Sequence, residues 1–311
     1  MVEKIALLWT AASTVTTTGA VDPGPAAAAA TSWWIWPLAL FVATIILGIL
    51  AVLAGVGGGV LYVPLVSSFF PFHLDFVRGA GLLVALSGSL AAGPGLLRKN
   101  LANLRLTLPL ALIASACSIV GAFVGLAAPT WLVQTALGIT IMFIAVLFIF
   151  SKNTEYPEVK EADGLARFLR LEGVYREESS GKSVHWRVWR TPQGMLLFIF
   201  IGVLAGMFGL GAGWANVPVL NLLMGAPLKV AVGTSKFLLS ITDTSAAWIY
   251  LNQGCIIPLI AVPSIIGIML GSFLGVKILA VAKPSIVRYI VIIMLFFAGA
   301  RALLKGLGIW P

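Results

Sequence analysis

The stretch 231–251 is almost entirely apolar, yet it contains a lysine and a carboxylate, Lys236 and Asp243. Ser240 lies between them, and this spacing predicts that the three side chains lie on one face of a helix. The two charged groups would be about 10 Å apart along the helix axis, which is long for a direct ion pair but suits a shared polar cavity. We predict that Lys236 faces an anionic ligand and that Asp243 is a candidate for proton coupling.

Both charged residues also have a structural explanation, because a charge at membrane depth is tolerated when it snorkels, pairs or faces water. Lys236 is close enough to the start of its apolar run to snorkel to the membrane surface. Asp243 has Thr242 and Thr244 beside it as hydrogen-bond partners, together with a neighbouring helix. Three further polar residues are expected to contribute to the ligand site, namely Asn216, Thr234 and Ser235.

Two glycine-rich segments, Gly57-Gly58-Gly59 and Gly211-Ala212-Gly213, interrupt apolar stretches of the chain. Unwound backbone at membrane depth lacks hydrogen-bond partners in lipid, so it has to be buried in protein or line a cavity. Each segment precedes a short apolar run that starts a helix, and a helix N-terminus attracts anions. We predict that these six residues line an anion-binding cavity. The alternative is that the glycines let helices pack closely.

The elements that position these residues are membrane helices. Of the 311 residues, 60% are hydrophobic and only 10% are charged, whereas soluble domains carry roughly a quarter charged residues. A span needs about 20 apolar residues. Five apolar runs precede a charged interval and five follow it: 36–54, 60–71, 77–97, 105–127, 131–150, 194–208, 214–225, 231–251, 256–280 and 285–304. We therefore expect an all-α membrane protein in which the short runs 60–71 and 214–225 are half-helices.

The two sets of five runs are copies of one another. Seven positions match at a constant separation of 154 residues: Gly55/Gly209, Gly57/Gly211, Gly59/Gly213, Val63/Val217, Pro64/Pro218, Gly79/Gly233 and Pro109/Pro263. Seven matches at one separation indicate an internal duplication. The first copy lacks the charges of the second, since Leu82 and Ser89 stand where the second has Lys236 and Asp243.

Loop charges predict that the two copies have opposite orientations. Arg98, Lys99 and Arg105 flank a loop whose counterpart, 252–256, has no charge. Conversely, three basic residues of the second copy surround a loop whose counterpart, 127–130, is uncharged: Lys277, Lys283 and Arg288. Because basic loops are cytoplasmic, the repeats are inverted and each has an odd number of crossings. Both termini are then periplasmic, although Arg301 and Lys305 near the C-terminus argue mildly against this.

These observations predict four segments in a multi-pass protein of the inner membrane. Residues 1–35 form an N-terminal tail, signal-like or interfacial; 36–150 and 193–311 form the two transmembrane repeats; 151–192 form a charged cytoplasmic loop. Leu165, Phe168 and Leu169 in that loop have helical spacing. The loop is either a solvated connector or a docking segment, and its Trp186-to-Arg190 end suits an interface anchor.

The sequence contains no residue pattern typical of a catalytic or metal site. The two histidines, His73 and His185, fall in separate loops on opposite expected sides, and the two cysteines lack the spacing of metal ligands. We expect no enzyme activity, no cofactor and no metal. The net charge of +9 reflects cytoplasmic loops that meet anionic lipid, so the expected partners are the lipid bilayer and a small anionic substrate, with no nucleic acid. The sequence leaves open whether the protein forms a homodimer.

At the glycine segments the sequence resembles the TauE/SafE family of membrane permeases, the sulfite and organosulfonate exporter group. The likeness spans about residues 36–305 and rests on three stretches: 55–59 with Val63-Pro64, 209–213 with Val217-Pro218, and Gly233-Thr234-Ser235. Ala212 stands where the family has a glycine, and the first copy has Gly79-Ala80-Gly81 without the hydroxyl groups. The resemblance implies a secondary transporter of anions such as sulfite, sulfoacetate, isethionate or taurine.

Residues and resemblance together predict a transporter that works by alternating access of two inverted halves. Export is the favoured direction, because an inside-negative potential favours anion exit by about 2.3 kcal/mol per charge per 100 mV. Import would need protons, for which Asp243 is the candidate. Two alternatives stay open. One is a passive anion channel on the same frame, and the other is a membrane scaffold that acts through the charged interval.

Overall fold

The computed structural model describes residues 34–53, 57–98, 101–150, 157, 159, 161–176, 183–279 and 284–309. The tail expected over 1–35 therefore lies almost wholly outside the described residues. The first set of helices comprises α3 Ile35–Leu53, α4 Gly58–Phe69, α5 Leu74–Arg98, α6 Leu104–Ala127 and α7 Thr130–Phe150. The second comprises α9 Thr191–Phe208, α10 Gly213–Pro218, the π-helix η1 Val219–Leu223, α11 Leu228–Asn252, α12 Pro258–Leu279 and α13 Pro284–Gly306. Between the sets lie α8 Gly164–Phe168, β1 Glu172–Arg176 and β2 Ser183–Arg187.

The helices coincide with the apolar runs, which confirms a helical membrane protein. Four helices in the described part of the chain are long and apolar enough to cross a membrane, with spans Leu74–Ala91, Leu104–Ala127, Thr191–Phe208 and Pro258–Gly275. Helix ends follow local chemistry. The side chain of Asn103 accepts a hydrogen bond from Leu106 N and so caps the start of α6, and Gly209 ends α9 in a left-handed conformation.

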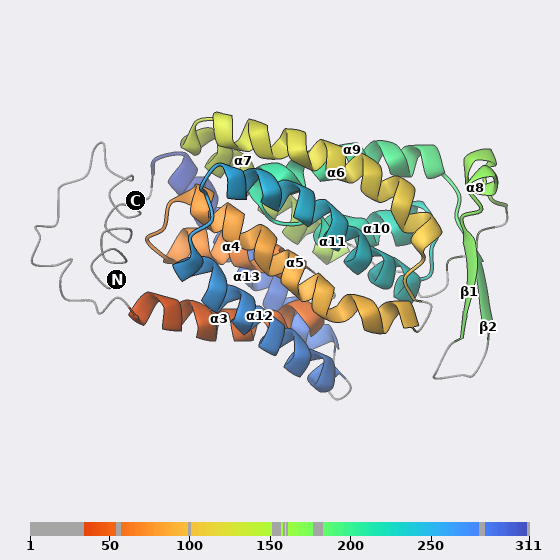
Figure 1. Ribbon diagram of the computed structural model, residues 1–311, viewed down its shortest axis with the longest axis horizontal. Coiled ribbons are helices and arrows are strands. Elements are labelled where there is room, and N and C mark those ends of the chain that lie inside the picture. Colours follow the sequence, from red (N-terminus) through yellow and green to blue (C-terminus); the bar gives the residue numbers. More distant parts are fainter. Residues whose placement is uncertain are drawn as a thin grey trace, which may run out of the picture.

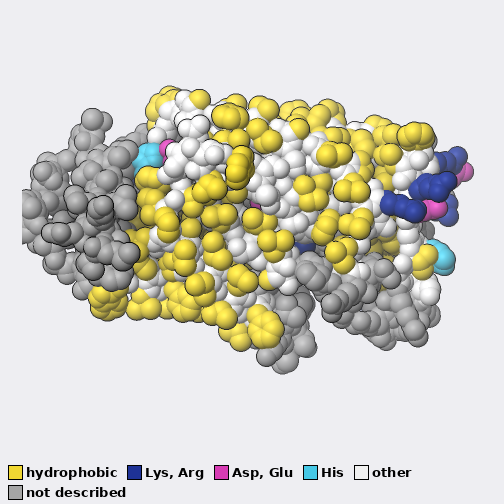
Figure 2. All heavy atoms as spheres, in the orientation of Figure 1, with side chains coloured by type: hydrophobic (Ala, Val, Ile, Leu, Met, Phe, Trp, Pro, Cys, Tyr) yellow, Lys and Arg dark blue, Asp and Glu magenta, His cyan; other side chains and the backbone are white. Residues whose placement is uncertain are grey.

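The bundle is elongated, and its two ends differ (Figure 1). One end, here called the hairpin end, carries α8, β1 and β2. At the other, the terminal end, α3 begins and α13 ends. The first helix of the second set, α9, begins at the hairpin end, so α3 and α9 run in opposite directions along the bundle. Lys and Arg side chains gather mostly at the hairpin end, whereas hydrophobic side chains cover the length of the bundle (Figure 2).

The helices of the two sets interlock. The main packed pairs are α3 with α12, α6 with α9, α5 with α11 and α7 with α13. If each helix is replaced by its counterpart in the other set, the same four pairs result. Single contacts repeat as well, because Gly79 packs against the carbonyl of Cys255 and Gly233 packs against the carbonyl of Leu101. The two contacts correspond to each other, because Gly233 follows Gly79, and Cys255 follows Leu101, by the same 154 residues that separate the glycine segments.

Small residues allow the paired helices to approach closely. A Cβ atom added to Gly271 of α12 would lie closer than 3.0 Å to the backbone of Ile45 in α3. Gly202 of α9 has the same relation to Ala114 of α6. Close approach of this kind is typical of helix pairs in lipid, where no hydrophobic effect drives helices together.

We expect Gly271→Ala to lower the thermal stability of the detergent-solubilised protein, because overpacking a close contact costs about 1–3 kcal/mol. The matched control is Gly88→Ala, also at a helical glycine, where the nearest atom to an added Cβ is Ser272 Oγ at 3.8 Å. Alanine there should leave the melting temperature unchanged or raise it. Equal melting temperatures for the two variants would contradict the packing given for α3 and α12.

The charged interval is more structured than a connector. Its helix α8 is only five residues long, and an antiparallel two-stranded sheet follows, with Val174 paired to His185. This hairpin was not predicted. Tyr175 and Trp186 are buried and pack in one cluster with residues of α6, α9 and η1. Trp186 is therefore a core residue rather than an interface anchor, whereas Trp189 is exposed with Arg190 over its ring.

Candidate functional site

The two glycine segments meet at the middle of the bundle. Gly57 is the extended residue that precedes α4, and 209–212 joins α9 to α10. We call these the first and second elbows. A Cβ atom on Gly213 would lie 2.9 Å from the backbone nitrogen of Gly57. Leu239, the twelfth of the 25 residues of α11, lies against both Gly57 and Gly213. The structure thus brings together two segments that are about 150 residues apart in the chain.

The second elbow needs glycine for its backbone conformation. Gly209 and Gly211 have φ angles of +67° and +69°, in the region that side chains with a Cβ disfavour. Ala212, which stands where a glycine was expected, has φ −87° and ψ 1°. That conformation is accessible to alanine. The departure at Ala212 is therefore compatible with the same elbow geometry.

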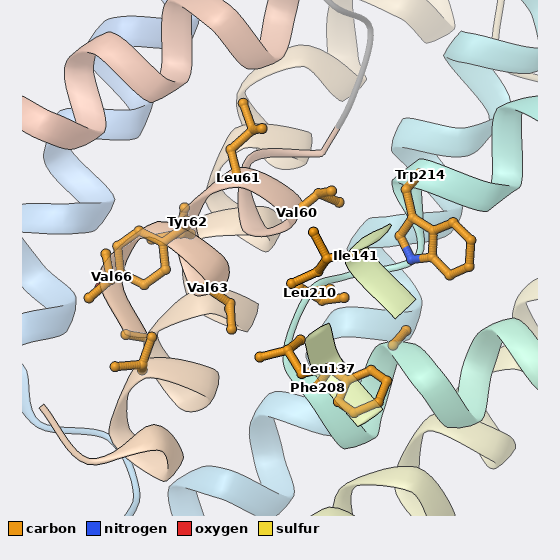
Figure 3. Close-up of a cluster of buried hydrophobic side chains, with 14 of the residues drawn as sticks. Val60, Leu61, Tyr62, Val63, Val66, Leu137, Ile141, Phe208, Leu210 and Trp214 are labelled. Carbon is orange, nitrogen blue, oxygen red and sulfur yellow. The ribbon is translucent and has the colours of Figure 1, made fainter. Parts of the chain in front are cut away.

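Close packing also explains part of the glycine pattern. A Cβ on Gly59, in the first turn of α4, would meet the carbonyl oxygen of Leu210 at 2.5 Å. Gly58 is buried as well, against Ile268 of α12. Figure 3 shows Val60 and Val63 on the α4 side of this contact and Leu210 and Trp214 on the side of the second elbow. The structural alternative for the glycines therefore holds at Gly59, alongside the predicted role in a site.

Asp243 lies against the second elbow. Its side chain is fully buried, and a Cβ on Gly211 would be 2.9 Å from its Oδ2. Neither carboxylate oxygen has a hydrogen-bond partner among the described residues. The expectation that Thr242 or Thr244 satisfies the carboxyl group is wrong, because Thr242 Oγ1 makes no hydrogen bond to described residues and Thr244 Oγ1 donates to Ser240 O. A buried carboxyl group without hydrogen-bond partners is costly and marks a functional candidate.

Lys236 lies two helical turns before Asp243 on α11, towards the hairpin end. Its side chain is partly buried, and its ammonium is near enough to interact electrostatically with the Asp243 carboxylate. Between them, Ser240 Oγ donates to the carbonyl oxygen of Phe237. The structure thus keeps the two charges on one helix and within electrostatic reach of each other.

The remaining predicted site residues separate into two groups. Asn216 is buried next to the second elbow, and both its side-chain Oδ1 and Nδ2 lack partners within the described part of the chain. Thr234 and Ser235 are buried nearer the hairpin end. Thr234 Oγ1 accepts a hydrogen bond from Asn103 N at 3.3 Å, so this hydroxyl group helps to attach α11 to the start of α6.

Two polar groups were not among the predicted site residues. Trp214 Nε1, in the first turn of α10, is buried without a hydrogen-bond partner among described residues. The second is the guanidinium of Arg78, because only 2% of the surface of this residue is exposed. The one signal in the sequence for a buried Arg78 is Asp75, three residues earlier, because residues at this spacing contact one another on a helix.

The polar groups near the elbows are of the types that binding sites use. Indole and amide donors from Trp214 and Asn216, a carboxyl group and a nearby ammonium suit an anion that binds together with a proton. Over the described residues no group of three or more His, Cys, Asp or Glu side chains is arranged to hold a metal ion. Both cysteines, Cys117 and Cys255, are free thiols.

Comparison with known proteins bears on the class of protein rather than on these site residues. A family model described as "Sulfite exporter TauE/SafE" matches residues 40–302. The "Probable membrane transporter protein YunE" of Bacillus subtilis (strain 168) is 24% identical over 278 residues, which cover 86% of this chain and 98% of the relative. The "Probable membrane transporter protein YdhB" of the same organism is 27% identical over 113 residues, 36% of this chain and 45% of that protein. No solved structure matches the chain significantly.

Proposed function

Because the chain belongs to the sulfite exporter TauE/SafE family and is a membrane transporter, we propose that it exports small sulfur-containing anions such as sulfite or C2 organosulfonates. It does so as a secondary transporter, in several passes through the inner membrane. The observation that carries the proposal is the position of Asp243, a buried carboxyl group without hydrogen-bond partners among described residues, against the elbow at Gly211.

We propose further that 36–150 and 193–311 are inverted repeats. The interlocked pairing of α3 with α12 and α6 with α9 supports this, as do the opposite directions of α3 and α9 (Figure 1). Exposed Arg105, Arg167 and Arg187 favour the hairpin end as the cytoplasmic side. Arg301 lies nearer the terminal end, where its guanidinium stacks at 4.6 Å over the ring of Phe69.

In this mechanism the substrate binds between the two halves, which rock about it to expose the site to each side in turn. The first turn of α4 offers backbone N–H groups that have no partners within the helix. Lys236 supplies positive charge from the hairpin side, and Asp243 takes up or releases a proton as the anion binds or leaves. Export needs little coupling because the membrane potential already favours anion exit.

The proposal is tested by counterflow in proteoliposomes. The purified protein is reconstituted, loaded with unlabelled sulfite, and given labelled sulfite, sulfoacetate, isethionate, taurine or sulfate outside. Accumulation of label that saturates with concentration and requires internal substrate supports a carrier of that anion. A flux that neither saturates nor needs internal substrate indicates a passive channel instead, and the lack of any flux overturns the proposal.

Lys236→Ala should raise the KM of the accepted anion about tenfold, because a hydrogen bond to a charged group is worth roughly 1.5–3 kcal/mol. The matched control is Lys229→Ala. Lys229 lies two turns earlier on the same helix and has an exposed side chain. The KM of the Lys229→Ala protein should therefore stay at the wild-type value. If the two variants have the same KM, Lys236 does not face the substrate.

A further inference from the structure

The terminal end of the bundle holds a buried polar cluster that the proposed binding site does not use. Its centre is the guanidinium of Arg78, in the second turn of α5. Arg78 Nη1 donates to the carbonyl oxygens of Gly125 at 3.0 Å and Met207 at 2.8 Å. Because these carbonyls belong to the C-terminal turns of α6 and α9, one side chain connects the two sets of helices.

Asp75 and Tyr250 complete this group, which we call the terminal cluster. Arg78 Nη2 forms an ion pair with Asp75 Oδ1. The guanidinium carbon of Arg78 lies 5.6 Å from the centre of the Tyr250 ring. Tyr250 Oη in turn donates to the carbonyl oxygens of Gly206 at 3.1 Å and Met207 at 3.3 Å. The cluster therefore attaches α5 and α11 to the same end of α9.

The terminal cluster also contacts the second elbow directly. A Cβ added to Gly209 would lie 2.4–2.8 Å from the backbone of Arg78, so the first residue of the elbow rests on Arg78 itself. Any movement of α9 or of the elbow away from α5 has to break the hydrogen bond between Arg78 and Met207. Breaking it would leave a buried guanidinium without one of its acceptors, which is costly.

The Asp75–Arg78 ion pair has no counterpart at the positions related to it by the duplication. Positions 154 residues after Asp75 and Arg78 are occupied by Lys229 and Val232. The backbone contact next to the cluster does have a counterpart, since Gly79 against Cys255 corresponds to Gly233 against Leu101. The two ends thus share their backbone packing but differ in the charged side chains that stabilise it.

We propose that the terminal cluster is a latch that keeps the terminal end of the transporter closed, with Arg78 as its positioning residue. The latch rests on the transport function proposed above, because alternating access requires that end to open. In the closed state Arg78 holds the second elbow against α5. Opening releases the guanidinium from Met207 and exposes the elbow and Asp243 to the terminal side.

The chain contains a native reporter for this movement. Cys255 lies in the loop between α11 and α12, where it is half-buried and its backbone contacts Gly79. Burial raises the pKa of its thiol, the carboxylate of Asp75 raises it further, and the guanidinium of Arg78 lowers it in part. The partial burial and the raised pKa both slow the reaction of the thiol with a maleimide. Since the sequence has only one other cysteine, Cys117→Ser leaves Cys255 as a single reactive site.

The test measures the rate at which a hydrophilic maleimide labels Cys255 in the full-length Cys117→Ser protein in nanodiscs. Asp75→Asn and Tyr250→Phe each weaken the latch, and Arg105→Gln is the control at an exposed arginine of the hairpin end. Asp75→Asn also removes a charge that acts on the Cys255 thiol. Labelling rates are therefore measured across pH, and the rate constants of the thiolate form are compared. Tyr250→Phe changes no charge and needs no such correction.

Labelling should be about tenfold faster in both latch variants, in line with the loss of one hydrogen bond in the cluster, and unchanged in Arg105→Gln. Unchanged rates in folded Asp75→Asn and Tyr250→Phe protein would overturn the latch. The same variants are also made in the Cys255→Ser protein, where only Cys117 is labelled. An equal rise in the labelling rate of Cys117 would overturn the latch as well, because it would indicate a general loosening of the protein. The assay needs no substrate, so it stands apart from the counterflow experiment on transport.

Discussion

Replacing Asp243 with asparagine should reduce anion uptake driven by a pH gradient about 100-fold, which corresponds to roughly 2.7 kcal/mol, while counterflow at equal pH on both sides persists. Asparagine has nearly the shape of aspartate but cannot bind or release a proton, so a proton gradient can no longer drive the anion. The separation of the two readouts matters, because loss of folding would abolish both of them.

The experiment uses the same proteoliposomes as the counterflow assay, with an imposed pH difference as the only driving force. Asp163→Asn is the control. Asp163 lies beside α8, far along the chain from the elbows, and its Oδ1 accepts a hydrogen bond from Thr191 Oγ1 at 2.8 Å, a bond that an amide oxygen can also accept. Wild-type uptake by Asp243→Asn would rule out proton coupling at this carboxyl group.

Gly211→Ala should abolish transport without preventing insertion into the membrane. Alanine at a φ of +69° costs about 1–2 kcal/mol in backbone strain. In addition, the new Cβ would lie 2.9 Å from Asp243 Oδ2 and 3.1 Å from Ala85 Cβ. The elbow therefore has to shift, or Asp243 has to move away from it, and either change alters the proposed site at its centre.

Gly254→Ala provides a close control for this variant. Gly254 has the same φ angle of +69°, but nothing lies within 4 Å of a Cβ built there. Both variants carry the same type of strain, and only Gly211→Ala acquires the contact with Asp243. Comparable expression with transport lost in Gly211→Ala alone is the expected result. Comparable transport by both variants would mean that the elbow at Gly211 tolerates a side chain and has no part in the site.

The helices were predictable because lipid imposes a simple rule on sequence. An apolar run in a membrane has to satisfy its backbone hydrogen bonds internally, so run and helix coincide. The short runs 60–71 and 214–225 became α4 and the pair α10–η1 for the same reason. The meeting of the elbows agrees with the proposed inverted duplication, in which equivalent segments approach each other near the symmetry axis.

What the sequence did not predict depends on contacts between distant segments. Arg78 resembles an interface anchor until the ends of α6 and α9 supply its acceptors. Thr234 resembles a ligand donor until Asn103 is placed beside it. The hairpin of β1 and β2 is concealed by a charged composition, because its buried side of Tyr175 and Trp186 is too short to give a clear periodic signal.

The interlocked helices have a consequence for biosynthesis. The principal partner of α3 is α12, which begins about 200 residues later in the chain. At a ribosomal rate of 5–20 residues per second, α3 resides in the membrane for roughly 10–40 s before its partner has been made. During that interval the small-residue faces of the first five helices are open to lipid and to other nascent chains. A chain that ends after α7 would leave these faces without their partners and exposed to membrane quality-control proteases.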